Sequence, residues 1–345
     1  MHTVVLHLTD LRPVVAPDEL VASLVPPPTF SDVSFASYRP NPDEPSQAAA
    51  VAAAEAFVTQ AMYVRGSKAG LLRKPRRGIG LYLDGGFGVG KTHLLASSYH
   101  AAKTPKLFAS FVEITNLVGA LGMADTVERL AKHSLVCIDE FELDDPGDTM
   151  LLSRLLSELF DRSVSVAATS NTLPGQLGEG RFAANDFLRE IRRIADGFQV
   201  VRVDGPDYRH RDLPAPPAPL SPQELQLRIS RTHGASLDEF DDLAKHLATL
   251  HPSCYRELVN GVSAVGVSGM RPAQDQAVAL RFVAFIDRLY DAGTPVLVAG
   301  EPADKIFTEE MLAGGYRKKY LRAISRITAL ARAGESVGLS PTSVL

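Results

Sequence analysis

The 345-residue chain contains no tryptophan and only two cysteines, Cys137 and Cys254. Two such cysteines build no disulfide framework and lack metal-ligand spacing, which favours a reducing cytoplasm. Lysine and arginine total 36 against 40 aspartates and glutamates, for a net charge of −4. No overall positive field therefore attracts nucleic acid, and with 45 % apolar residues the composition fits an enzyme with a large core.

Long hydrophobic runs are also missing. The longest run of small apolar residues, Ala48 to Ala54, stops before Glu55 and is better explained as a helix. The first 24 residues carry Asp10, Asp18 and Glu19 and lack a basic leader with a long apolar core. We therefore expect neither a transmembrane segment nor a secretory signal.

One glycine-rich loop stands between two apolar segments, Gly80 to Leu83 and His93 to Tyr99, which predict a buried strand and a helix. Its glycines let backbone N–H groups turn toward anionic phosphates, Lys91 can reach the β and γ phosphates, and the Thr92 hydroxyl can bind Mg²⁺. The loop therefore predicts a site for ATP and Mg²⁺, although a glycine-rich turn without a ligand is the alternative. Its residues are Gly85, Gly86, Phe87, Gly88, Val89, Gly90, Lys91 and Thr92.

Two carboxylates follow a second apolar segment. Leu135 to Ile138 predict a buried parallel strand, and Asp139 and Glu140 follow at its C-terminal end, the edge where open α/β sheets bind ligands. We expect Asp139 to hold Mg²⁺ through water and Glu140 to polarise a water molecule for attack on the γ-phosphate. The alternative is a strand that merely ends in an acidic turn.

A third apolar segment, Val164 to Ala168, predicts a strand that leads to Asn171. Asn171 can hydrogen-bond the γ-phosphate or the attacking water, or it can cap a turn. Asp148 to Phe160 predicts an amphipathic helix before this strand. The phosphate loop is thus followed by a strand that ends in two carboxylates and then by a strand that ends in a polar residue. This order is typical of additional-strand P-loop ATPases, so we predict an α/β P-loop fold.

Prolines suggest the organisation of the chain. The run from Pro214 to Pro222 predicts a stiff linker. In the N-terminal part, Phe35, Tyr38 and Gln47 are candidates for contact with the adenine base, with ordinary packing as the alternative. The three expected regions are an N-terminal arm and helix flanking the nucleotide site (1–78), a P-loop ATPase core (79–213) and a C-terminal α/β subdomain (214–345).

The C-terminal third predicts a further α/β extension. Ser236 and Glu239 are spaced as a capping box for a helix through Leu250. Val262 to Val267 and Pro295 to Ala299 predict strands, which either extend the central sheet or form a small α/β lid.

Two groups of basic residues can serve assembly or binding. Arginines before the last core strand lie where an oligomeric ATPase supplies an arginine finger to its neighbour, so they predict a homo-oligomer. The second group can meet single-stranded DNA, an anionic surface or an acidic partner. A solvated face is the alternative for both. The first group is Arg181, Arg189, Arg192 and Arg193. The second group is Arg65, Lys68, Arg73, Lys74, Arg76 and Arg77.

Several segments resemble the ZapE-like ATPases, which include the mitochondrial AFG/LACE-type members. The likeness covers nearly the whole chain and is more specific than the phosphate loop alone. The matching segments are Cys137 to Leu143 with Asp145, Asp148 and Met150, then Ala168 to Asn171, Asp204 to Arg209, Arg281 to Tyr290 and Ser325 to Ile327.

This resemblance implies an AAA+-like fold with a parallel central sheet and helices on both faces, Mg²⁺-dependent ATP hydrolysis and, in bacteria, a cell-division role acting on the tubulin-like protein FtsZ. Mitochondrial relatives are linked to quality control of respiratory-chain subunits. The family commonly has an arginine where Asp186 precedes Phe187 and Leu188 here, so the finger expectation moves to Arg181 or Arg189.

Three functions stay open. The first is an ATPase that remodels a protein partner in cell division, and the second is a helicase-loader-like ATPase whose Arg65 to Arg77 cluster binds single-stranded DNA. The third is a nucleotide-dependent scaffold without turnover. The acidic net charge and the missing stacking residues favour the first.

Overall fold

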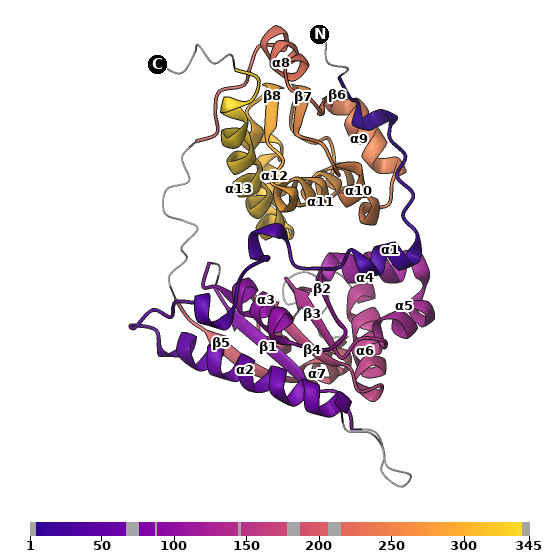
Figure 1. Ribbon diagram of the computed structural model, residues 1–345. Helices are drawn as coiled ribbons and strands as arrows, with labels where there is room; N and C mark the ends of the chain where they lie inside the picture. Colours follow the sequence, from indigo (N-terminus) through magenta and orange to yellow (C-terminus); the bar gives the residue numbers. More distant parts are fainter. Residues whose placement is uncertain are drawn as a thin grey trace. The chain divides into compact units, whose positions relative to one another are not determined.

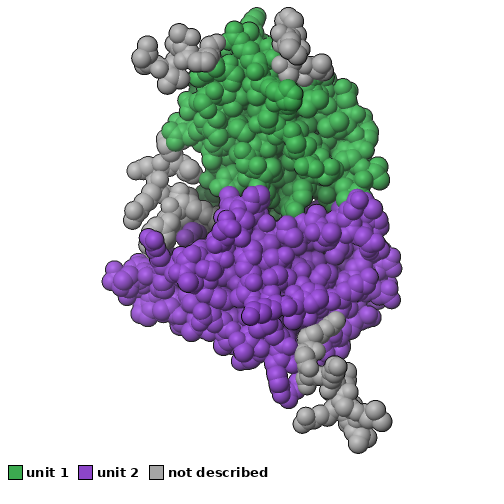
Figure 2. Space-filling model, viewed as in Figure 1, with its two compact units in different colours: residues 1–15, 213–345 green, residues 16–212 purple. Residues whose placement is uncertain are grey.

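The computed structural model describes residues 5–66, 76–86, 88–143, 146–177, 187–205 and 215–339 (Figure 1). Contacts divide the chain into two compact units, one of residues 16–212 and one of residues 1–15 with 213–345 (Figure 2). The first 15 residues thus belong with the C-terminal unit. From the sequence we expected them to form one region with residues 16–78. Within the described ranges, no helix combines the length and the apolar character needed to cross a membrane.

The larger unit is built on five parallel strands in the order β2-β3-β4-β1-β5. Strand β4 lies between β1, which leads into the glycine-rich loop, and β3, which carries the acidic pair. This order confirms the additional-strand arrangement expected from the sequence. The strands are β1 (Gly80–Gly85), β2 (Lys106–Ser110), β3 (Leu135–Asp139), β4 (Ser165–Ser170) and β5 (Phe198–Val203).

Helices cover both faces of this sheet, as predicted. Successive strand residues point to opposite faces, and the two faces are buried in two separate apolar clusters. Leu81 and Cys137 pack with α2 and α3, whereas Tyr82 and Ile138 pack with α4, α5, α6 and α7. The helices are α1 (Pro17–Ala22), α2 (Pro45–Gly66), α3 (Lys91–Ala101), α4 (Phe111–Leu121), α5 (Met123–Leu130), α6 (Pro146–Asp161) and α7 (Leu188–Asp196), with 3-10 turns η2 (Pro28–Phe30), η3 (Phe35–Ser37) and η4 (Pro174–Gln176).

The smaller unit has its own parallel sheet, in the order β6-β7-β8. Among the described strands, none joins this sheet to the five-stranded one, so the expected extension of the central sheet is wrong and a separate α/β unit is present. Its elements are β6 (Ala235–Glu239), β7 (Ala264–Met270), β8 (Val296–Gly300), α8 (Pro222–Ser230), α9 (Phe240–Thr249), α10 (Tyr255–Leu258), α11 (Gln276–Ala292), α12 (Glu309–Ala313) and α13 (Arg317–Ala333), with 3-10 turns η1 (Leu8–Asp10), η7 (Pro252–Cys254), η8 (Ala303–Lys305) and η9 (Gly334–Ser336).

The predicted capping box at Ser236 and Glu239 is also wrong. Ser236 is a buried residue of β6 that pairs with Val265 in β7. Glu239 caps α9 by itself, because its carboxylate accepts hydrogen bonds from the N–H groups of Asp241 (2.8 Å) and Asp242 (3.2 Å). Spacing alone cannot separate a capping box from the end of a strand followed by a capped helix.

The N-terminal arm completes one edge of the smaller sheet. Leu6 pairs in parallel with Ser236, and Leu8 is fully buried in the main apolar cluster of this unit. The buried Asp238 carboxylate accepts from the N–H groups of Leu8 (3.0 Å) and Thr9 (3.1 Å) and from the Thr9 hydroxyl (2.9 Å). These contacts join segments that lie 230 residues apart in the sequence.

Truncating Leu8 tests whether this arm contributes to the core. Leu8→Ala empties a site that is 0 % exposed, so we expect the free energy of unfolding to fall by about 2–5 kcal/mol in urea denaturation. Val14→Ala is the matched control, because Val14 is 91 % exposed in the same arm. Indistinguishable unfolding of the two variants would contradict the packing described for this arm.

Candidate nucleotide-binding site

The glycine-rich loop connects β1 to α3 and requires glycine at particular positions. Gly88 and Gly90 have φ angles of 74° and 88°, a left-handed backbone that glycine adopts without strain. A Cβ atom at Gly90 would also lie 2.5 Å from the Tyr38 ring. The tight turn is thus specified by the sequence, as expected. The predicted loop residue Phe87 lies outside the described residues.

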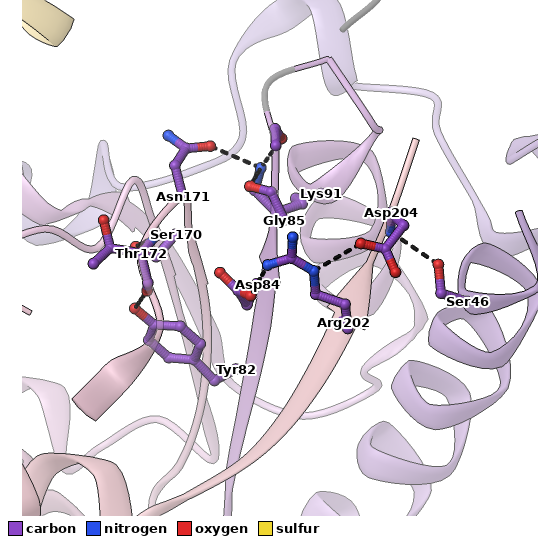
Figure 3. A network of polar contacts seen from close by, with 11 residues as sticks. Ser46, Tyr82, Asp84, Gly85, Lys91, Ser170, Asn171, Thr172, Arg202 and Asp204 are labelled. Atoms are coloured by element: carbon purple, nitrogen blue, oxygen red, sulfur yellow. Dashed lines mark hydrogen bonds and ion pairs between the residues drawn. The ribbon is translucent and has the colours of Figure 1, made fainter. Parts of the chain in front are cut away.

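Lys91 is the centre of the polar contacts in this loop. Its side chain is largely buried, and its Nζ donates to the carbonyl oxygens of Gly85 (2.8 Å) and Gly86 (2.5 Å) and to Asn171 Oδ1 (2.9 Å) (Figure 3). The Asn171 amide also donates to Glu142 Oε1 at 3.4 Å. The structure therefore brings Lys91 and Asn171 together, although they are 80 residues apart.

Thr92 and Asp139 meet beside this lysine. The Thr92 hydroxyl lies 3.2 Å from Oδ1 and 3.1 Å from Oδ2 of Asp139. Hydroxyl and carboxylate oxygens are ligands that Mg²⁺ accepts, usually with water molecules in its remaining positions. With the N-terminus of α3 and the Lys91 ammonium group close by, the residues fit a metal-bound polyphosphate.

Glu140 follows β3 with an unusual backbone. Its φ angle is 55°, in the left-handed region that residues other than glycine rarely occupy. Its N–H donates to Thr169 Oγ1 (3.0 Å), and the N–H of Phe141 donates to the Thr169 carbonyl (2.7 Å). The Thr169 hydroxyl lies 2.5 Å from Asp139 Oδ1. Such backbone strain concentrates at functional sites, where neighbouring contacts maintain it.

Sequence reasoning missed Thr169 and a further ionic network. Thr169 belongs to the segment Ala168 to Asn171 that resembles the ZapE-like ATPases, but no signal in the sequence assigned a contact to its side chain. Arg202 on β5 pairs with the buried Asp84 on β1 and donates to Asp204 Oδ1 (2.8 Å), whose own N–H donates to Ser46 (2.8 Å) (Figure 3). The hydrogen bonds that Arg202 donates to the carboxylates of Asp204 and Asp84 raise the pKa of Arg202. This network ties β1, β5 and α2 together next to the loop.

Tyr82 also helps to hold the edge of the sheet. Its hydroxyl donates to the Thr172 carbonyl at 2.7 Å (Figure 3). Burial raises the pKa of Tyr82, so the hydroxyl stays protonated and remains a donor. The bond joins β1 to the segment that carries Asn171.

The candidates for contact with the adenine base have partners within the protein. The Tyr38 hydroxyl donates to the Val89 carbonyl at 2.7 Å, and its ring packs edge-on against His93. Gln47 donates to the Asp204 carbonyl at 2.8 Å. Phe35 packs against the apolar cluster of α2 and α3. These contacts are those that the packing alternative expects.

Both basic groups are only partly described. Arg181 lies outside the described residues, while Arg189, Arg192 and Arg193 are exposed on α7. Of the second group, Lys68, Arg73 and Lys74 lie outside the described residues, as does the Arg65 side chain. Arg76 stacks over the Tyr63 ring at 4.8 Å, and Arg77 pairs with Asp161 at 3.0 Å.

Comparison with known proteins identifies the family. The model of the AFG1-like ATPase family matches residues 14–229 and 223–336, nearly all of the chain. The chain belongs to the AFG1-like ATPase family. This membership confirms the family resemblance and the P-loop fold expected from the sequence.

Curated relatives match parts of the chain. Cell division protein ZapE of Escherichia coli (strain K12) is 35 % identical over 161 residues, which cover 43 % of this chain and 43 % of that protein. Lactation elevated protein 1 homolog B of Danio rerio is 26 % identical over 302 residues, which cover 70 % of this chain and 59 % of that protein. The matched segments therefore span less than two thirds of these relatives.

Solved structures match more loosely. The DnaC helicase loader has a TM-score of 0.36 and 16 % identity, with 51 % of this chain and 99 % of that one covered. A DNA replication initiation factor has a TM-score of 0.39 and 11 % identity, with 87 % and 97 % covered. Likenesses this loose support no conclusion about function.

Removing the Tyr38 hydroxyl tests whether it positions the loop. A trans peptide points its C=O and N–H in opposite directions, so the bond to the Val89 carbonyl also orients the N–H of Gly90. We expect Tyr38→Phe to weaken binding of a fluorescent ATP analogue by about 3- to 10-fold, the size of one net hydrogen bond. Tyr63→Phe, at an exposed tyrosine of α2, is the control. Wild-type affinity in Tyr38→Phe would show that the hydroxyl does not position the loop.

Proposed function

We propose that this chain binds ATP with Mg²⁺ and hydrolyses it at the edge of the five-stranded sheet. The supporting observation is the convergence of two contacts, Lys91 with Asn171 and Thr92 with Asp139, where β1, β3 and β4 end. Membership of the AFG1-like ATPase family supports the same activity.

Each residue has a role in this proposal. The buried Lys91 ammonium places a fixed positive charge against the β and γ phosphates. Mg²⁺, when bound, neutralises phosphate charge, and Thr92 and Asp139 are the residues that would hold it. Glu140 takes a proton from the attacking water, and Asn171 orients that water or the γ-phosphate. Positioning and fixed charge supply most of the catalysis in phosphoryl transfer.

We propose that hydrolysis serves to remodel a protein partner in cell division, with an FtsZ-like protein as the client. The name of the Escherichia coli relative, a cell division protein, supports the cell-division role, and the FtsZ-like client rests on the family resemblance. Arg189, exposed on α7, is the described candidate for a finger that reaches the site of a neighbouring subunit in a homo-oligomer.

One observation favours the helicase-loader alternative. Arg76 stacks on Tyr63, which is 61 % exposed, and an accessible cation–aromatic pair suits nucleic-acid bases. Arg77 is paired with Asp161, and that ion pair offsets part of the local positive charge. The net charge of −4 gives no wider attraction for DNA.

Two substitutions separate nucleotide binding from turnover. Lys91→Ala removes a charge-assisted phosphate contact, so we expect ATP affinity to fall about 10-fold or more. Glu140→Gln removes the base, so we expect normal ATP affinity with turnover lowered about 100-fold or more. Phosphate release and a fluorescent ATP analogue measure the two quantities. Glu128→Gln, at an exposed residue of α5, is the control.

Equal turnover by the wild type and Glu140→Gln would rule out the assigned base. A wild type that binds ATP without steady-state turnover would instead support the scaffold function.

A second experiment separates the two partner classes. The Glu140→Gln variant, saturated with ATP, is mixed with FtsZ polymers in a sedimentation assay. In a separate filter-binding assay it is mixed with single-stranded DNA across a salt series. We expect co-sedimentation with FtsZ and weak DNA binding. Tight DNA binding that weakens steeply with salt would instead indicate contacts to phosphates and favour the helicase-loader function.

A further inference from the structure

Thr169 makes an unusual set of contacts at the end of β4. The pairing of β3 with β4 ends at Ile138 and Ala168, so Asp139 and Thr169 are the next residues on each strand. Thr169 is 2 % exposed. Its hydroxyl accepts from the Glu140 N–H and contacts the Asp139 carboxylate, and its carbonyl accepts from the Phe141 N–H. One residue therefore holds three consecutive residues of the acidic segment.

The geometry requires a hydroxyl rather than a methyl group at this position. A hydroxyl group has one hydrogen and two lone pairs. Because a carboxylate accepts only, the Thr169 hydrogen points to Asp139, which leaves a lone pair for the Glu140 N–H. The same group thus fixes the Asp139 carboxylate and the backbone that aims the Glu140 side chain.

The backbone of Glu140 shows why such a contact is needed. A φ of 55° in a residue other than glycine persists only where its surroundings maintain it. The two N–H bonds from Glu140 and Phe141 to Thr169 lie on either side of the strained residue. Without the hydroxyl, the Glu140 N–H loses this partner and the strained turn loses one of its supports.

We infer that Thr169 is a positioning residue for hydrolysis, because its hydroxyl sets the metal-binding carboxylate of Asp139 and the proton-accepting carboxylate of Glu140 in one arrangement. This inference rests on the proposed function. It assigns Thr169 no contact with ATP, so the hydroxyl affects turnover and the response to Mg²⁺ more than it affects nucleotide binding.

The test compares Thr169→Val, which keeps the shape and loses the hydroxyl, with Thr169→Ser, which keeps the hydroxyl. We expect Thr169→Val to lower kcat about 10- to 100-fold, the usual effect of misplaced catalytic groups. The Mg²⁺ concentration for half-maximal activity should rise, while affinity for a fluorescent ATP analogue in EDTA should stay within about twofold of wild type, because free-nucleotide binding uses Lys91 and the loop. Thr169→Ser should restore both properties, and Thr59→Val on α2 is the matched control.

Several results would overturn the inference. Wild-type kcat and Mg²⁺ response in Thr169→Val would remove the proposed role while leaving ATP hydrolysis intact. A Thr169→Ser variant as slow as Thr169→Val would reduce the role to packing. So would a Thr169→Val variant that loses affinity for the ATP analogue in EDTA and unfolds at a lower temperature than the wild type. Absence of turnover in the wild type would overturn the proposed function itself, and the inference with it.

Discussion

The buried ammonium group of Lys91 is the constraint on which the rest of the site depends. A charge removed from water is tolerated only where hydrogen-bond partners surround it. Lys91 finds them in two loop carbonyls and in Asn171. Because β1 and β4 are adjacent and parallel, their C-terminal ends reach the same edge, and this adjacency makes the contact possible.

Strand β4 is the element that unites the site. It pairs with β1 on one side and β3 on the other. Two residues that follow this strand contact β1 and its loop. Asn171 contacts Lys91 of the phosphate loop, and Thr172 accepts a hydrogen bond from Tyr82 on β1. On the other side, Thr169 contacts the segment that carries the two carboxylates. The additional strand therefore links the lysine to the acidic pair.

Features encoded locally could be predicted from the sequence, and features that depend on register could not. The loop, the acidic pair and Asn171 each follow a buried strand, so strand polarity predicts that they lie at the same edge of the sheet. Thr169 has a role only because its hydroxyl contacts Asp139, one residue beyond the last paired residues of β3 and β4. Arg202 has one only because it lies across from Asp84 in the register of β1 and β5.

The errors in the smaller unit have the same origin. Ser236 pairs with both Leu6 and Val265, and these non-local partners keep it in a strand where its spacing from Glu239 suggested a helix cap.

A crystal structure with a non-hydrolysable ATP analogue and Mg²⁺ tests the central claim most directly. We predict that the phosphates contact Lys91 and that the metal lies beside Thr92 and Asp139. A nucleotide bound away from this edge, with Lys91 still hydrogen-bonded to Asn171 and contacting no phosphate, would contradict the account.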